Sequence, residues 1–264
     1  MTQPQDPQPI TSRDNTLLKL LRRLSHETTA YRKAGQFWVE GDHLCRAALA
    51  RGWQPALAVL SQSSLASEHA GLAKLAPRAV VVPDALFADF SGLESAAGIG
   101  YLFNLPVQRA LHTAVPTVIL DRVQDAGNVG SILRSASAFG FVQVLALKGT
   151  AALWSPKVLR AGMGAHFGLS LVEGLEEPAL SDLALPLIIT SSHQGALIHQ
   201  QRLPWPCAWV MGHEGQGVGQ VLQSRAAMFV RIAQPGGEES LNVAAAAAIC
   251  LHASAVQCDL SLRE

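Results

Sequence analysis

Five short segments in the second half of the chain are predominantly apolar along their whole length, without alternation of apolar and polar residues. A strand with one face in water alternates, whereas a parallel strand covered by helices on both faces does not. Helical patterns separate the segments, which is typical of a parallel α/β sheet with ligand sites at the carboxyl ends of its strands. The predicted strands cover residues 117–120, 142–147, 187–190, 208–211 and 228–232, and the predicted helices cover 130–139, 156–165, 219–227 and the alanine-rich end.

The first half of the chain has a different pattern. Residues 1–12 are rich in Pro and Gln, which predicts a disordered arm. Residues 15–52 are expected to be helical, with Gly52 well placed to end the second helix. A small α/β unit is therefore expected before a linker at residues 107–116, because shorter apolar runs follow at 56–60, 79–82 and 100–103.

Composition excludes several classes of protein and leaves one question open. The formal net charge is +0, no segment approaches ~20 consecutive apolar residues, and the first residues do not resemble a signal peptide. We therefore expect a cytoplasmic protein with no membrane partner and with reduced thiols. The four cysteines lack C-x-x-C spacing and, with the nine histidines, predict no metal site.

The open question concerns the basic residues near the N-terminus. Residues 11–36 contain six basic side chains against two acidic ones. This excess fits a solvated helix face or an RNA contact. The basic residues are Arg13, Lys19, Arg22, Arg23, Arg32 and Lys33.

Polar, glycine-containing loops follow three of the predicted strands. In the first loop, Asn128 and Gly130 lie in the turn from strand to helix, and Arg134 follows one helical turn later. Glycine permits close approach of another backbone or a ligand, and the guanidinium fork of arginine suits phosphate. A tight turn with a surface arginine would have the same sequence.

The second loop, G212-HEGQGVG, contains four glycines within eight residues. It does not match the dinucleotide-binding pattern G-x-G-x-x-G, because Gln220 occupies the position of the last glycine. The chain also lacks a G-x-x-x-x-G-K-[ST] phosphate loop. Glu214 would repel a phosphate but would tolerate a ligand with a positive centre; alternatively, it caps a helix.

The third loop follows the last predicted strand and leads into the alanine-rich helix. Ser240 is the expected N-cap, and Asn242 can both donate and accept hydrogen bonds through its amide. Ile232 and Leu241 are expected to hold a flat aromatic ring between them.

The helix itself contains five consecutive alanines, Ala244 to Ala248, and no charged residue between 243 and 255. A helix on a protein surface normally has a charged face. We therefore expect this helix to be buried on every side.

In combination, these residues resemble the motifs of the SpoU, or TrmH-type, RNA 2′-O-ribose methyltransferases of the SPOUT superfamily. The first motif resembles D125-AGNVGSILR, the second V210-MGHEGQG and the third S240-LNVAA. K157-VLRAGMGAHF is similar to the family's segment between the first two motifs, and F37-WVEGDHL is similar to a domain often fused in front. The chain departs from the family pattern at Ala126, Gly162 and His213, where proline, serine and asparagine, alanine or serine are usual.

The resemblance implies an α/β fold with two domains. A ribosomal-protein-like RNA substrate-binding domain would cover residues 13–106, and a parallel-sheet SPOUT methyltransferase domain with a trefoil knot would cover 117–264. Sequence patterns alone do not suggest a knot, because true knots are rare. The resemblance also implies a homodimer, S-adenosylmethionine as cofactor, and rRNA or tRNA as the substrate.

The same resemblance assigns roles to individual residues. The catalytic residues would be Arg134, Asn128, Glu214, Ser240 and Asn242. The cofactor would be bound by Met211, Gly212, Gly217, Ile232 and Leu241.

This chemistry agrees with the residue types. A ribose hydroxyl is a poor nucleophile, so it needs a nearby proton acceptor and an aligned methyl donor. Arg134 is expected to position phosphate rather than to accept a proton, because the pKa of arginine exceeds ~12. The 2′-hydroxyl distinguishes RNA from DNA, which favours an RNA contact for residues 11–36.

Two other functions compete with RNA methylation. A catalytically silent RNA-binding protein with the same fold would not need its intact motif residues. A nicotinamide-dependent oxidoreductase would need the glycine pattern that the chain lacks.

Overall fold

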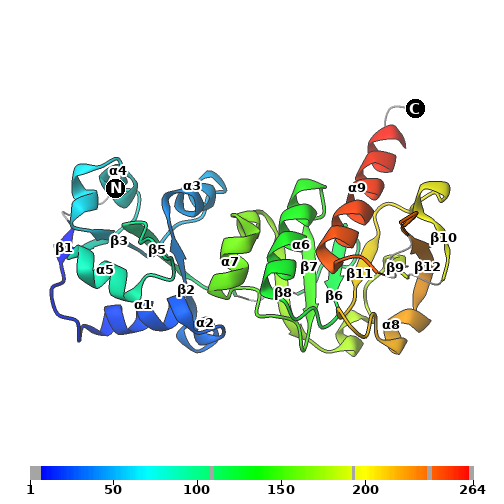
Figure 1. Ribbon diagram of the computed structural model, residues 1–264, viewed down its shortest axis with the longest axis horizontal. Helices are drawn as coiled ribbons and strands as arrows, with labels where there is room; N and C mark the ends of the chain where they lie inside the picture. The colour runs from blue at the N-terminus through cyan, green and yellow to red at the C-terminus, as the bar shows by residue number, and fades with distance from the viewer. Residues whose placement is uncertain (1–6, 108–109, 192–193, 237–239, 262–264) are drawn as a thin grey trace. The chain divides into compact units, whose positions relative to one another are not determined.

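The computed structural model describes residues 7–107, 110–191, 194–236 and 240–261 (Figure 1). The chain forms two compact units. The first consists of the described residues up to Val107 together with Trp154–Phe167, and the second consists of the rest.

The first unit contains a mixed five-stranded sheet of order β1-β4-β3-β5-β2. Strands β1, β4 and β3 are parallel, whereas β5 is antiparallel to both β3 and β2. The strands are β1 (Gln8–Pro9), β2 (Gln36–Glu40), β3 (Leu57–Ser61), β4 (Ala79–Val82) and β5 (Ile99–Asn104). The helices are α1 (Thr16–His26), α2 (Ala30–Ala34), α3 (Asp42–Ala50), α4 (His69–Ala73), α5 (Asp84–Phe90) and α7 (Pro156–Gly162), with 3-10 turns η1 (Ser63–Ala66) and η2 (Ala165–Gly168).

Two expectations for this unit need correction. Residues 15–52 are not helical throughout, because β2 lies between α2 and α3 and buries Phe37 in the core. Aromatic and β-branched side chains favour this extended pairing with β5. The second helix does end before Gly52, whose φ of 78° lies in the left-handed region that glycine adopts freely.

The predicted disordered arm, residues 1–12, is also wrong over its described part. Residues 1–6 lie outside the described residues. Gln8–Pro9 form β1, an edge strand that pairs with β4, and the Ile10 N–H donates to the Val81 carbonyl at 2.9 Å. Proline is compatible with this position because an edge strand leaves part of its backbone unpaired.

Acidic side chains face most of the basic residues in the 11–36 segment. Arg13 and Arg22 both pair with Asp89 on α5. Lys19 pairs with Asp14 at 3.0 Å, and Arg23 pairs with Glu27 at 3.3 Å. The positive excess counted along the sequence is therefore reduced in space by Asp89, which lies far from α1 in the chain.

The second unit contains a seven-stranded sheet of order β10-β12-β9-β11-β6-β7-β8, in which every pair is parallel. The predicted parallel α/β fold is confirmed. The strands are β6 (Thr117–Leu120), β7 (Gln143–Leu147), β8 (Ser170–Leu175), β9 (Leu187–Thr190), β10 (Ala196–Leu197), β11 (Ala208–Met211) and β12 (Ala226–Arg231). The helices are α6 (Ala126–Ala138), α8 (Gln220–Ser224) and α9 (Val243–Ser261), with 3-10 turns η3 (Glu177–Leu180) and η4 (Ile198–Gln200).

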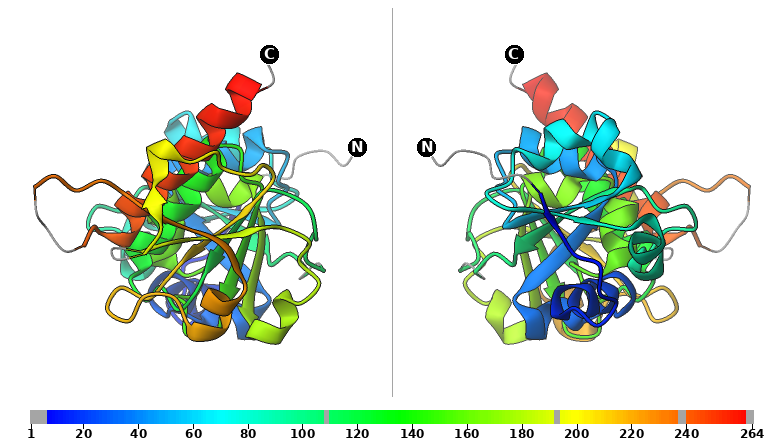
Figure 2. Two further views of the ribbon diagram at one scale, coloured as in Figure 1. Left: turned by 90° about the vertical axis from the view of Figure 1, so that its right-hand side faces the viewer. Right: turned by 90° about the vertical axis from the view of Figure 1, so that its left-hand side faces the viewer.

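The sequence pattern predicted the five interior strands and missed the two at the edges. Strands β8 and β10 are only partly buried, so they lack a continuous apolar run. Helices α6 and α9 lie side by side on one face of the sheet (Figures 1 and 2). The trefoil knot stays a prediction.

One stripe of α9 is anchored to this sheet. Ala247, Cys250, Leu251 and Ser254 are buried at helical spacing. The Ser254 hydroxyl accepts a hydrogen bond from the indole Nε1 of Trp209, a fully buried residue of β11, at 2.9 Å. The expected burial on every side is wrong within the single chain, because Ile249 is 41% exposed and Val256 is 42% exposed.

The thiols Cys45, Cys207 and Cys250 are free and buried. Burial raises the pKa of Cys207 to about 12 and raises the pKa values of the other two thiols above their ordinary range. No helix within the described residues is long and apolar enough to cross a membrane. In the same part of the chain, no three side chains of His, Cys, Asp or Glu gather as ligands for a metal ion.

We expect Ser254→Ala to destabilise the second unit by about 1–3 kcal/mol, because it leaves the buried Trp209 N–H unpaired. Denaturant unfolding followed by fluorescence measures the change. Ser224→Ala is the matched control, since Ser224 is exposed and its hydroxyl bonds only to the nearby Val221 carbonyl. Equal unfolding midpoints for the two variants would refute the anchoring role of Ser254.

Candidate functional site

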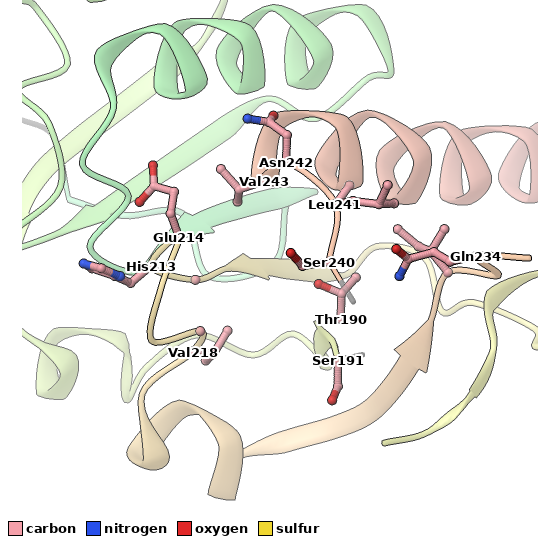
Figure 3. Close-up of a pocket in the computed structure, with 14 residues that line it drawn as sticks. Thr190, Ser191, His213, Glu214, Val218, Gln234, Ser240, Leu241, Asn242 and Val243 are labelled. Atoms are coloured by element: carbon pink, nitrogen blue, oxygen red, sulfur yellow. The ribbon is translucent and has the colours of Figure 1, made fainter. Parts of the chain in front are cut away.

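A cavity of about 450 Å³ opens at the carboxyl ends of β9, β11 and β12 and at the start of α9 (Figure 3). This is the edge of a parallel sheet at which ligands bind in such folds. Its volume lies within the range of small-molecule sites. The cavity is lined by Thr190, Ser191, Gly212, His213, Glu214, Gly217, Val218, Ile232, Gln234, Ser240, Leu241, Asn242, Val243 and Ala246.

The structure brings most of the predicted site residues together here. Met211 is buried at the end of β11 beside the cavity lining. Asn128 lies next to the cavity through its hydrogen bonds, and Arg134 is the predicted residue that stands apart. The lining includes the predicted residues Gly212, Glu214, Gly217, Ile232, Ser240, Leu241 and Asn242.

A chain of side-chain hydrogen bonds connects the three loops. Asn128 Nδ2 donates to Glu214 Oε1 at 3.2 Å, and Asn128 Oδ1 accepts from Asn242 Nδ2 at 2.9 Å. Asn128 lies in the first turn of α6, which follows β6, whereas Glu214 belongs to the loop after β11 and Asn242 to the loop after β12. The amide of Asn128 therefore serves both neighbours at once, with its donor facing one and its acceptor facing the other.

Glu214 also binds the backbone at the start of α6. Its two carboxylate oxygens accept hydrogen bonds from the N–H groups of Gln124 and Asp125, each at 3.2 Å. Partial burial raises the pKa of Glu214, but these bonds and the bond from Asn128 outweigh it and hold the pKa below its ordinary value. The carboxylate is therefore ionised at neutral pH, and its contribution is lost only as the pH falls through this lowered pKa.

Asn242, rather than Ser240, caps α9. Asn242 Oδ1 accepts from the N–H groups of Ala244 and Ala245, at 2.9 and 3.2 Å. The prediction for Ser240 was wrong because the helix begins at Val243, which makes Asn242 the preceding residue. Ser240 instead lines the cavity as an exposed hydroxyl.

The glycine-rich loop after β11 folds back on itself. His213 and Gly217 form an isolated antiparallel bridge, with N–H to carbonyl distances of 3.1 and 2.8 Å. A Cβ added to Gly212 would lie 2.4 Å from backbone atoms of Gly217 and Val218, so only glycine fits there. His213 Nδ1 accepts from the backbone N–H groups of Gly215 and Gln216, which leaves the ring hydrogen on Nε2.

Asp121 and Arg122 brace the far side of the same loop. Asp121 is 1% exposed, and its carboxylate accepts from the Gly219 N–H at 2.6 Å and from the Arg122 guanidinium. Arg122 Nη1 also donates to Gln216 Oε1 at 3.2 Å. Sequence reasoning missed this brace, although Asp121 directly follows a correctly predicted strand.

Sequence reasoning also missed Thr190, Ser191 and Gln234. Thr190 ends β9 and Ser191 follows it. Because β9 pairs with both β11 and β12, its carboxyl end reaches the same cavity. The signal was available, because residues 187–190 were predicted to be a strand. Nothing in the sequence pattern distinguished Gln234.

Arg134 lies on α6 and is exposed to solvent. It does not line the cavity, and it forms no hydrogen bond or ion pair with the described part of the chain. Its guanidinium is therefore available to a molecule outside the chain.

Comparison with known proteins identifies the kind of protein that carries this site. The profile of the SpoU rRNA methylase family matches residues 116–252. The chain is 28% identical over 248 residues to the 23S rRNA (guanosine(2553)-2′-O)-methyltransferase RlmP of Bacillus subtilis, covering 92% of this chain and 97% of that protein. An uncharacterized tRNA/rRNA methyltransferase of Synechocystis is 31% identical, with 92% of each chain covered.

Solved structures give the same result over both units. The crystal structure of an RNA 2′-O ribose methyltransferase has a TM-score of 0.79 at 29% identity and covers 95% of this chain and 99% of that one. The SpoU methyltransferase AviRb of Streptomyces viridochromogenes, solved in complex with AdoMet, has a TM-score of 0.83 at 21% identity and covers 93% and 100%; at this identity it shows the fold.

These comparisons confirm the predicted family and class of enzyme, and they give no support to a silent RNA-binding protein or a nicotinamide-dependent oxidoreductase. The match extends over residues 116–252, and one relative is 31% identical across 92% of the chain. The chain belongs to the SpoU rRNA methylase family.

Proposed function

We propose that this RNA 2′-O-methyltransferase binds S-adenosylmethionine in the cavity at the ends of β9, β11 and β12. It transfers the methyl group to a ribose 2′-hydroxyl of rRNA or tRNA. The observation that carries the proposal is the hydrogen-bonded chain Glu214–Asn128–Asn242, which holds three motif loops around one cavity. Relatives with this activity, such as RlmP, align with both units of the chain.

The cavity suits this cofactor. Ile232 and Leu241 provide apolar walls for the adenine ring, and Thr190 and Ser240 provide hydroxyl groups. The buried oxygen Gln234 Oε1 has no partner among the described residues, so it is available to a ligand donor. The cofactor supplies an electrophilic methyl group on a positively charged sulfur, and the ionised Glu214 near the cavity tolerates that charge.

The geometry divides the site residues into those that hold the loops in place and one that contacts the RNA. Glu214 and Asn128 act by fixing the loops, because their polar atoms bind one another and the start of α6. Arg134 is exposed and has no partner in the described part of the chain, so it binds and positions an RNA phosphate next to the reacting ribose. Rate enhancement then comes mainly from alignment of the hydroxyl with the methyl group.

The enzyme acts as a homodimer through α9. Within the single chain this helix leaves an apolar side in water, formed by Ala245, Ile249 and Val256. His252 lies on the same side, and its ring packs against the ring of Phe139 at the end of α6, with the ring centroids 5.3 Å apart. An exposed apolar strip on a helix with no charged residue between 243 and 255 supports contact with a second copy.

The first unit binds RNA, as the family resemblance implied. The enzyme is cytoplasmic, as its composition predicted. The basic segment supports RNA binding less strongly than its composition suggests, because Asp89 and other acids pair with much of it. Stronger support comes from the relatives, which align over this unit as well as over the methylase domain.

Arg134→Ala should lower methyl transfer by about a hundredfold or more, because it removes the proposed anchor for the RNA phosphate. Binding of S-adenosylmethionine should change less than about twofold, since Arg134 does not line the cavity. Transfer of a labelled methyl group to total rRNA and tRNA measures the first quantity, and titration calorimetry measures the second. Arg134→Lys, which keeps the charge, should retain part of the activity. Turnover at the wild-type rate by the alanine variant would rule out the proposed role.

Ile249→Asp should convert the dimer to a monomer, because it introduces a charge into the apolar side of α9. Light scattering after size-exclusion chromatography measures the mass. Val221→Asp is the matched control, since Val221 is 51% exposed on α8 and takes no part in this side of α9. A wild-type protein that is monomeric at micromolar concentration would contradict the homodimer.

Glu214→Gln should weaken S-adenosylmethionine binding by about threefold to tenfold, because an amide cannot accept from all three donors that now bind the carboxylate. Calorimetric titration measures the change. Glu176→Gln removes an exposed ion pair with Lys148 and should leave the affinity unchanged. Equal affinities for the two variants would show that the Glu214 bonds do not hold the cofactor site.

A further inference from the structure

One residue of the cavity lining has a buried polar atom without a partner among the described residues. Gln234 follows β12 and lines the cavity, and its Oε1 has no hydrogen-bond partner among the residues that the structure describes. Buried polar atoms in folded proteins are almost always paired. The amide oxygen only accepts hydrogen bonds, so its missing partner is a donor.

The surroundings of Gln234 indicate which donor fits. In Figure 3, Gln234 lies beside Leu241, at the end of the cavity away from His213 and Glu214. Ile232 also lines the cavity, so apolar side chains accompany the neutral acceptor of Gln234. That combination suits the edge of a flat, uncharged heterocycle, whereas an ammonium group would need a carboxylate to offset its burial.

We propose that Gln234 Oε1 accepts a hydrogen bond from the 6-amino group of the cofactor's adenine and thereby selects adenine over purines without that donor. The proposal rests on the proposed cofactor site and deepens it. Gln234 is a specificity-determining residue for the cofactor, and it takes no part in the transfer step.

The test compares two ligands on the full-length protein by titration calorimetry. The ligands are S-adenosylhomocysteine and its purine analogue, which lacks only the 6-amino group. Wild-type protein should bind S-adenosylhomocysteine about threefold to tenfold more tightly than the analogue, as expected for one neutral hydrogen bond. Gln234→Met has similar volume without an acceptor and should bind the two ligands equally.

Two further variants complete the design. Gln234→Glu keeps acceptor oxygens and should retain a preference for S-adenosylhomocysteine at least as large as that of wild type. Gln200→Met is the matched control, because Gln200 is exposed and outside the cavity lining, and it should behave as wild type.

The outcomes distinguish this proposal from the proposed function. Equal binding of the two ligands by Gln234→Met, with preference kept by Gln234→Glu, supports the role of Gln234. The role of Gln234 is overturned if Gln234→Met keeps the wild-type preference for S-adenosylhomocysteine, or if Gln234→Glu loses that preference. The result for Gln234→Glu decides between the two outcomes if the methionine variant does not fold. Failure of wild-type protein to bind S-adenosylhomocysteine at all would instead refute the cofactor site itself.

Discussion

The two-sided amide of Asn128 is the interaction on which the rest of the site depends. It joins Glu214, 86 residues away, to Asn242, 114 residues away. An amide group donates to a carboxylate through its nitrogen and accepts from a second amide through its oxygen. An aspartate would place a second negative charge against Glu214, and an aliphatic side chain would leave both partners unpaired. Three motifs that are distant in sequence are therefore joined beside one cavity, because the amide of Asn128 has both a donor and an acceptor.

The parallel sheet makes this link possible, and α9 carries two further contacts that depend on it. Strand β11 pairs with both β6 and β9, so the loops that follow them begin at the same edge. Asn242 then has two tasks, because it binds Asn128 through its nitrogen and caps α9 through its oxygen. Further along the helix, Ser254 binds Trp209 in the sheet. The cavity and the exposed apolar side of α9 are thus fixed by the same helix, so ordering one helps to order the other.

Sequence patterns predicted the parts of this structure that depend on local burial along the chain. They failed where contacts between residues distant in sequence determine the structure. Four interior strands were found because both of their faces are buried, and β12 was found because its residues are mostly apolar. Strands β8 and β10 escaped because edge strands are partly exposed. The third motif was recognised, but the choice of Asn242 over Ser240 as the cap depended on where α9 begins. The charge of the basic segment was counted correctly, yet Asp89 pairs with Arg13 and Arg22 from 76 and 67 residues away. No local pattern contains that information.

The state of each polar group constrains how a ribose hydroxyl is activated. The Glu214 carboxylate has a lowered pKa and is occupied by three donors, which makes it a weak base. His213 uses its acceptor nitrogen Nδ1 for two backbone N–H groups, so its free nitrogen is a donor. The guanidinium of Arg134 has only donors and no acceptor. Because none of these candidates is a free strong base, the geometry favours catalysis by alignment. S-adenosylmethionine would supply an electrophilic methyl group, and the segments joined by Asn128 would fix the direction from which a ribose hydroxyl meets it.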